Sequence, residues 1–317
     1  MTSPPIEEEL RGALRDDLTR ALRRLPELAS GDLRFMPLSG GITNRNYLVT
    51  GASGGGKYVL RLAGNDTHLL GISREVEHAA TVAAAGVGVG PEVVAFIRPE
   101  GYLVTRFIEG RPVPEDEMRN APERLAEAAD ALRRVHNGPA IPGLFVPFRI
   151  VEAYRALAIS RGVTIPPEYE LAQSIARRIE LACLTAPVGL RPCHNDLLNA
   201  NFIHDGSRLR IVDWEYAGMG DPSFDLGNFS INHELDADGD EALLQAYAGS
   251  VQPSARARIT LMRVLSDFRE AMWGVLQQGI SALDVDFVAY AAEHFDRLLT
   301  VASRPAFERA LSDAGDT

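Results

Sequence analysis

The chain has 317 residues, of which 46% are apolar, and a formal net charge of −11 at pH 7. This length allows two lobes with separate cores, and the acidic balance excludes nucleic acid as a partner because its phosphates would be repelled. The two cysteines, Cys183 and Cys193, are typical of reduced thiols in a cytoplasmic protein. The acidic start and the lack of a long apolar run predict a cytoplasmic location without membrane insertion.

The first hundred residues predict a small unit of helix and strand. Leucines at helical spacing indicate an amphipathic helix or helix pair over 6–29, and 33–50 is expected to form two strands. The loop between those strands contains Gly40, Gly41, Thr43 and Asn44. Glycines allow a backbone to approach phosphate closely, although such a loop is weak support by itself.

A strand over 58–62, a helix over 73–85 and strands over 91–96 and 101–107 complete this unit. Gly110, Pro112 and Pro114 then interrupt the chain. We therefore expect an N-terminal lobe over 1–109 and a C-terminal lobe over 110–317.

The second unit is predicted to be mostly helical, because apolar residues recur on one helix face. The expected helices cover 122–136, 149–160, 167–184, a segment from Asp221, 239–249, 254–279 and 284–302. The predicted class is α+β, with a small sheet-containing lobe and a larger helical lobe.

The most informative stretch is Cys193–Ile203, which is followed by Ile211–Tyr216. Its polar residues have the spacing His-x-Asp-x4-Asn, and an Asp ends the next apolar run. Phosphoryl transfer from a nucleotide needs one carboxylate for the acceptor hydroxyl and oxygen ligands for magnesium. Asp196 fits the first role, and Asn201 and Asp213 fit the second. The turn 204–207 predicts a hairpin that brings Asn201 and Asp213 to neighbouring strand ends.

Three motifs resemble the choline/ethanolamine kinase family, which belongs with the aminoglycoside phosphotransferases and has a protein-kinase-like fold. The motifs are His194–Asn201, Asp213–Gly218 and Phe224–Asn228. The resemblance is strongest over 191–234 and weaker from about 35 to 300. It implies a two-lobed fold with an antiparallel sheet in the small lobe, and ATP and Mg²⁺ as cofactors.

On the nucleotide side, the resemblance implies that the loop with Gly40, Gly41, Thr43 and Asn44 contacts ATP. It also implies that Arg61 grips phosphate and pairs with Glu75 on the following helix, with Glu77 as the competing choice. Phe107 and Ile108 would meet adenine through their backbone groups.

On the acceptor side, the resemblance implies a late helix that carries Trp273, with Glu270 at a position where the family has a second Trp. Glu215 and Glu234 are further candidates for binding the acceptor. His194 and Asp225 are expected to be structural, the Asp225 carboxylate holding the catalytic loop through hydrogen bonds.

These residues favour a kinase that phosphorylates the hydroxyl of a small cationic amino alcohol such as choline or ethanolamine, with a homodimer as a candidate assembly. Thiamine and aminoglycosides are alternative acceptors on the same fold. A nucleotide-binding pseudokinase is an alternative of another class, against which the complete set of Asp196, Asn201 and Asp213 argues.

Overall fold

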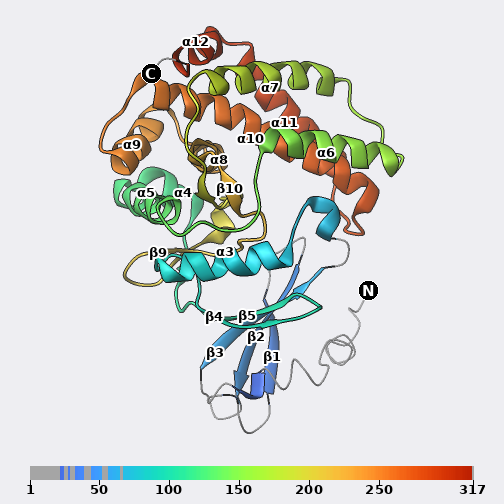
Figure 1. Cartoon of the computed structure of the whole chain (residues 1–317), viewed down its shortest axis with the longest axis vertical. Coiled ribbons are helices and arrows are strands. Elements are labelled where there is room, and N and C mark those ends of the chain that lie inside the picture. The colour runs from blue at the N-terminus through green and yellow to red at the C-terminus, as the bar shows by residue number, and fades with distance from the viewer. Residues whose placement is uncertain are drawn as a thin grey trace.

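The computed structural model describes residues 22–24, 28, 33–38, 44–51, 56–64 and 67–315, which form two lobes (Figure 1). The predicted helix over 6–29 lies mostly outside the described residues. The predicted phosphate-loop residues Gly40, Gly41 and Thr43 also lie outside them.

The small lobe contains one antiparallel sheet of five strands in the order β1-β2-β3-β5-β4. The strands are β1 (Leu33–Leu38), β2 (Asn44–Gly51), β3 (Lys57–Ala63), β4 (Val93–Ile97) and β5 (Tyr102–Arg106). In β3 the side chains alternate as strand geometry requires: Tyr58, Leu60 and Leu62 are buried in the core. Arg61 consequently points to the opposite face, toward the other lobe.

Helix α3 (Arg74–Gly86) lies between the sheet and the helical lobe (Figure 1). The Ser73 side chain caps its first turn by accepting a hydrogen bond from the Val76 N–H. The prediction of a helix here is confirmed, and its position puts the buried Glu77 side chain against the junction of the lobes.

The chain passes from one lobe to the other between β5 and β6 (Arg111–Pro112). Strand β6 pairs with β8 (Phe202–His204), which pairs with β9 (Leu209–Ile211), so the segment after 110 already belongs to the larger unit. The boundary at 109/110 stays a prediction, and it falls within this crossing.

The larger lobe is helical, as predicted. Its helices are α4 (Glu115–Asn120), α5 (Pro122–His136), α6 (Pro147–Ser160), α7 (Glu168–Thr185), α8 (Pro222–Asn232), α9 (Ala237–Ala248), α10 (Pro253–Ile280), α11 (Phe287–Ala302) and α12 (Pro305–Asp313). None of the described helices is both long enough and apolar enough to cross a bilayer.

The long helix α10 forms the centre of this lobe. Every residue from Val264 to Gln277 is buried, and the helix contacts α6, α8, α11 and α12. A helix buried on all sides is normally apolar all round, yet this stretch contains Asp267, Arg269 and Glu270. These charged side chains must therefore find partners inside the lobe.

Candidate active site

The loop that carries Asp196 is held in place by a buried carboxylate on α8. Strand β7 (Arg191–Cys193) leads into the loop and pairs with β10 (Gly218–Gly220). Asp225 accepts hydrogen bonds from the His194 N–H (2.8 Å) and the Asn195 N–H (2.7 Å). Burial alone raises the pKa of Asp225, but the hydrogen bond from His136 and these loop contacts outweigh it and hold that pKa below its usual range. These contacts are those expected of a residue that fixes the loop.

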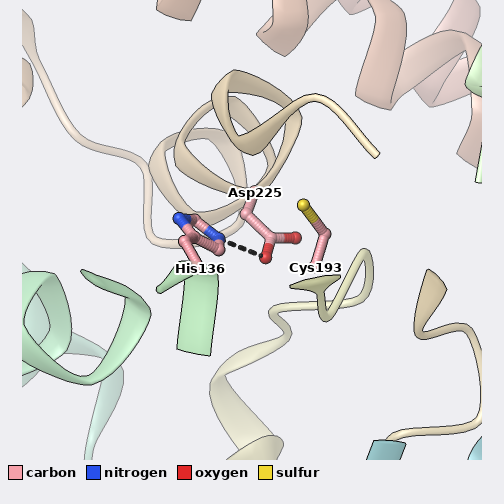
Figure 2. Close-up of side chains that lie close together, drawn as sticks. All are labelled: His136, Cys193 and Asp225. Atoms are coloured by element: carbon pink, nitrogen blue, oxygen red, sulfur yellow. Dashed lines mark hydrogen bonds and ion pairs between the residues drawn. The ribbon is translucent and has the colours of Figure 1, made fainter. Parts of the chain in front are cut away.

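His136 and Cys193 lie beside the same carboxylate (Figure 2). His136 contacts Asp225 through Nε2 at 3.0 Å and Tyr247 through Nδ1 at 2.7 Å. A metal ion bound by this group would compete with the hydrogen bonds that Asp225 already accepts. Burial also raises the pKa of the Cys193 thiol, which disfavours the thiolate that a metal needs. We infer a hydrogen-bonded anchor here.

His194 bridges the loop and the hairpin. Its Nδ1 accepts from the Asp196 N–H at 3.2 Å, so its Nε2 carries the proton and donates to the Val212 carbonyl at 3.0 Å. The ring is fully buried against Trp214, and burial lowers its pKa. A neutral His194 therefore links Asp196 to the segment that carries Asp213.

The predicted hairpin is confirmed, with Phe202 opposite Ile211 in the β8–β9 ladder. One further hydrogen bond joins the Val212 N–H to the Asn201 carbonyl at 3.0 Å. Asn201 and Asp213 therefore flank neighbouring strand ends. Asp213 has a φ of 69°, a left-handed conformation that is uncommon outside glycine and that occurs at functional sites.

Asp196 forms hydrogen bonds with Asn201 of the hairpin and with Arg269 of α10. Its carbonyl accepts a hydrogen bond from the Asn201 amide at 2.9 Å, and its Oδ1 accepts one from Arg269 at 2.8 Å. Burial raises the pKa of Asp196 to about 7, because the loss of solvent outweighs the attraction of Arg269. The carboxylate of Glu270 adds to this rise.

Arg61 reaches the hairpin from the small lobe. Its Nη1 lies 2.6 Å from Asp213 Oδ1 and 2.6 Å from Glu77 Oε1. The expected pairing with Glu75 is wrong: Glu75 is exposed and pairs with Arg98. Glu75 and Glu77 are two residues apart, so they point in different directions from the helix.

Arg74 is a residue of this site that the sequence analysis missed. It contacts Glu77 at 2.6 Å, Asn44 at 2.8 Å and Glu215 at 3.3 Å. Asn44 also donates to Glu215 at 2.7 Å. Glu215 is thus held by the small lobe, which differs from the expected contact with an acceptor. The sequence feature that could have revealed Arg74 is its position three residues before Glu77, because residues at this spacing lie on the same helix face.

A cleft of about 360 Å³ opens between the lobes at these residues. Both lobes contribute to its lining, with Arg61 and Glu77 on one side and Asn201 and Asp213 on the other. Its apolar wall includes Val59, Leu103, Phe107, Ile108 and Ile203. The predicted adenine-contacting residues and the predicted metal ligands therefore line one cleft.

Aromatic residues gather beyond Asp196, on the α10 and α11 side. The Trp273 indole N–H donates to the Tyr216 hydroxyl at 3.2 Å, and its ring packs edge-on against Phe287 and Tyr290. Glu270 lies on the same helix face as Trp273, as expected. Its two oxygens accept from Arg269 at 2.6 Å and from Tyr290 at 2.8 Å.

Glu234 does not join this group. It follows α8 with a φ of 51°, its side chain is exposed, and it pairs with Arg119 of α4. This position does not fit the expected role of Glu234 in binding an acceptor. Arg269, by contrast, was missed, because a sequence gives no sign that one arginine of a long helix points into a site.

Comparison with known proteins identifies the family. The model of the phosphotransferase enzyme family matches residues 34–260. The chain is 28% identical over 209 residues to protein LicA of Haemophilus influenzae, a match that covers 66% of this chain and 61% of that protein. A solved structure of a protein that is also named LicA, in complex with AMP, has a TM-score of 0.71 at 23% identity and covers 88% of this chain and 96% of that one.

A choline/ethanolamine kinase family protein from Mesorhizobium loti is 31% identical, with a TM-score of 0.81. That similarity covers 95% of this chain and 99% of the other. The chain therefore belongs to the phosphotransferase enzyme family and, within it, to the choline/ethanolamine kinase family.

Proposed function

We propose that the protein transfers the terminal phosphoryl group of ATP to the hydroxyl of a small amino alcohol such as choline or ethanolamine. The observation that carries this proposal is that Asn201 and Asp213 line the cleft that Arg61 enters, and that Asp196 is joined to Asn201 through its backbone carbonyl. Carboxylate and amide oxygens are ligands that Mg²⁺ prefers, so the donor set of Asn201 and Asp213 fits this ion. Magnesium bound there would neutralise charge on the phosphates.

In the proposed reaction, the acceptor hydroxyl oxygen forms a bond to the terminal phosphorus of ATP. The bond from that phosphorus to the bridging oxygen breaks, and ADP leaves. Asp196 orients the hydroxyl and receives its proton. Arg61, whose guanidinium is fixed by Glu77, would hold phosphate oxygens.

Nucleotide binding is supported by the apolar wall of the cleft and by the LicA structure, which contains AMP. Phe107 and Ile108 would meet the adenine. A cytoplasmic location, where ATP is plentiful, and a homodimer are further parts of this proposal.

The cationic acceptor is supported by the side chains beyond Asp196. Ammonium groups bind aromatic faces, and Trp273, Tyr216 and Tyr290 lie together there. The name of the Mesorhizobium loti relative points to the same two acceptors.

The test is turnover of ATP and Mg²⁺ by the purified protein with choline, ethanolamine, thiamine or kanamycin. We expect phosphorylation of choline or ethanolamine. Transfer only to thiamine or kanamycin would refute the proposed acceptor, and ATP binding without any transfer would indicate a pseudokinase.

A further inference from the structure

Arg269 lies in the middle of α10 and is only 2% exposed. A buried guanidinium is costly unless charged and polar groups compensate it. Its Nη2 contacts Asp196 Oδ1 at 2.8 Å and Glu270 Oε1 at 2.6 Å, and its planar group lies 5.0 Å from the centre of the Tyr216 ring. These contacts place a fixed positive charge directly on the proposed base.

A second layer holds Arg269 itself. Glu270, which accepts from Arg269 through Oε1, also accepts from the Tyr290 hydroxyl through Oε2 at 2.8 Å. The side chains therefore form a continuous series from α11 to the catalytic loop, in the order Tyr290, Glu270, Arg269 and Asp196. Both carboxylate oxygens of Glu270 accept hydrogen bonds from protein side chains. Its negative charge therefore stabilises Arg269 more directly than it would bind an acceptor.

We propose that Arg269 is a positioning residue that fixes the Asp196 carboxylate for the acceptor hydroxyl, with Glu270 and Tyr290 holding Arg269. The proposal rests on the proposed function. The terminal torsion of an aspartate has a broad, two-fold preference, and a hydrogen bond to Oδ1 selects one orientation. Asp196 Oδ2 is then the oxygen that receives the hydroxyl proton.

The charges of this series also suit a cationic acceptor. Asp196 and Glu270 supply two carboxylates against the single guanidinium of Arg269, so the group remains negative overall when both are ionised. The arginine can thus orient the base without making its surroundings positive. Without Glu270, the pair of Arg269 and Asp196 would be neutral and would attract an ammonium group less.

The first test separates kcat from KM in Arg269→Met and Arg269→Lys. Misplacement of a catalytic group by about 1 Å can cost ~100-fold, so we expect kcat to fall by roughly 10- to 100-fold in Arg269→Met with little change in the KM for ATP. Arg269→Lys should recover part of the loss, and Glu270→Gln should lower kcat by a smaller factor. Unchanged kcat in Arg269→Met would overturn the proposal.

Arg258→Met is the matched control. Arg258 is also a buried arginine of α10, and it contacts Asp221 and the Ala186 carbonyl far along the helix from Arg269. We expect this variant to lose stability and keep its kcat at a temperature where it is folded. An equal loss of kcat in both variants would reduce Arg269 to a general structural role and overturn the proposal.

The second test combines Arg269→Met with Asp196→Asn. If Arg269 acts through Asp196, its replacement should cost no further activity once Asp196 has been replaced. A further loss of the same size in the double variant would show that Arg269 acts elsewhere, for example on the acceptor.

A double-mutant cycle on stability, with Arg269→Met and Asp196→Asn, distinguishes failure of this inference from failure of the proposed function. The urea midpoint of unfolding should shift less in the double variant than the sum of the two single shifts, whether or not the wild type phosphorylates choline or ethanolamine. Additive midpoint shifts would refute the coupling of Arg269 to Asp196. Absence of transfer by the wild type would refute the proposed function instead.

Discussion

Asp213 is the residue on which the proposed metal dependence rests. It lies at the end of the hairpin beside Asn201, and Arg61 contacts its Oδ1. We expect Asp213→Ala to abolish the tightening of ATP binding by Mg²⁺, because it removes a charged oxygen ligand. Calorimetry of ATP with and without Mg²⁺ measures this. Equal tightening by Mg²⁺ in the variant and the wild type would exclude Asp213 as a ligand.

Replacement of Trp273 tests the proposed binding site for the acceptor. A desolvated contact between a cation and an aromatic ring contributes about 2 kcal/mol, and 1.4 kcal/mol corresponds to about tenfold in affinity. We expect Trp273→Ala to raise the acceptor KM by roughly tenfold while the ATP KM stays nearly constant.

Phe307→Ala is the control for Trp273→Ala. Phe307 on α12 is buried in the same core cluster, away from the site. It should lower the melting temperature without changing the acceptor KM. If both variants only lose stability, Trp273 belongs to the core alone.

At the residue scale, the sequence predicted the groups whose spacing along the chain fixes their positions. Asp196, Asn201 and Asp213 lie on one loop and one hairpin, and Asn201 and Asp213 flank neighbouring strand ends as expected. The sequence does not give the rotation of α3 about its axis, so it does not distinguish Glu75 from Glu77 as the partner of Arg61. Arg269 contacts a residue 73 positions away, and no local pattern specifies such a pair.

At the scale of elements, α8 and α10 determine where the loop with Asp196 lies. Asn228 of α8 accepts from the Leu197 N–H at 2.6 Å and donates to Ser266 of α10 at 2.9 Å. The helices approach closely at Gly227, where a Cβ atom would lie 2.6 Å from the Cβ of Met262. A methyl group at this position would force the helices apart.

We therefore expect Gly227→Ala to lower the free energy of unfolding by about 1–3 kcal/mol and to reduce kcat, because it displaces α8. Urea denaturation and steady-state kinetics measure the two effects. Gly86→Ala in α3 is the matched control: a Cβ there meets nothing within 4 Å among the described residues, so this variant should gain up to about 1 kcal/mol. A stable, active Gly227→Ala would contradict the close packing.

His233, at the end of α8, should make stability depend on pH. It is 2% exposed, its Nδ1 donates to the Phe229 carbonyl, and burial lowers its pKa to about 4. Between about pH 6.5 and 4 the unfolded chain binds a proton that the folded chain excludes. The free energy of unfolding therefore falls as the pH drops through this range, by at most about 3 kcal/mol.

His233→Phe removes this dependence of stability on pH. The Phe229 carbonyl still accepts a hydrogen bond from the backbone N–H of residue 233 in the variant. We expect the stability of the variant relative to the wild type to rise as the pH falls from about 7 to 4.5, and to stay constant between about pH 7 and 8. A difference that does not change with pH would show that His233 is not buried in its neutral form.

The elements themselves were largely predictable. Apolar periodicity indicated the five strands of the small lobe and the long helices α5, α10 and α11. The short helix α4 and the terminal helix α12 were missed, since six and nine residues give too little periodicity. Strands β7 and β10 have three residues each, and their pairing depends on the loop that they support.

At the scale of the whole molecule, the two lobes meet through ion pairs at the cleft. Arg61 and Arg74 from the small lobe contact Asp213 and Glu215 from the larger one. The partners in these two ion pairs are 152 and 141 positions apart in the sequence, and a single sequence does not specify contacts between such distant residues. Nucleotide phosphates and Mg²⁺ would enter where these charged groups meet, so binding and the arrangement of the lobes should be coupled.

The most direct measurement of the proposed function is ³¹P NMR of ATP, Mg²⁺ and choline or ethanolamine with the wild type and with Asp196→Asn. For the wild type we expect a phosphate ester and ADP in equal amounts. For Asp196→Asn we expect formation of the ester to slow by about 100-fold or more, since base catalysis contributes ~10²–10⁴-fold. Release of inorganic phosphate without an ester, or an unchanged rate in Asp196→Asn, would contradict phosphoryl transfer at this site.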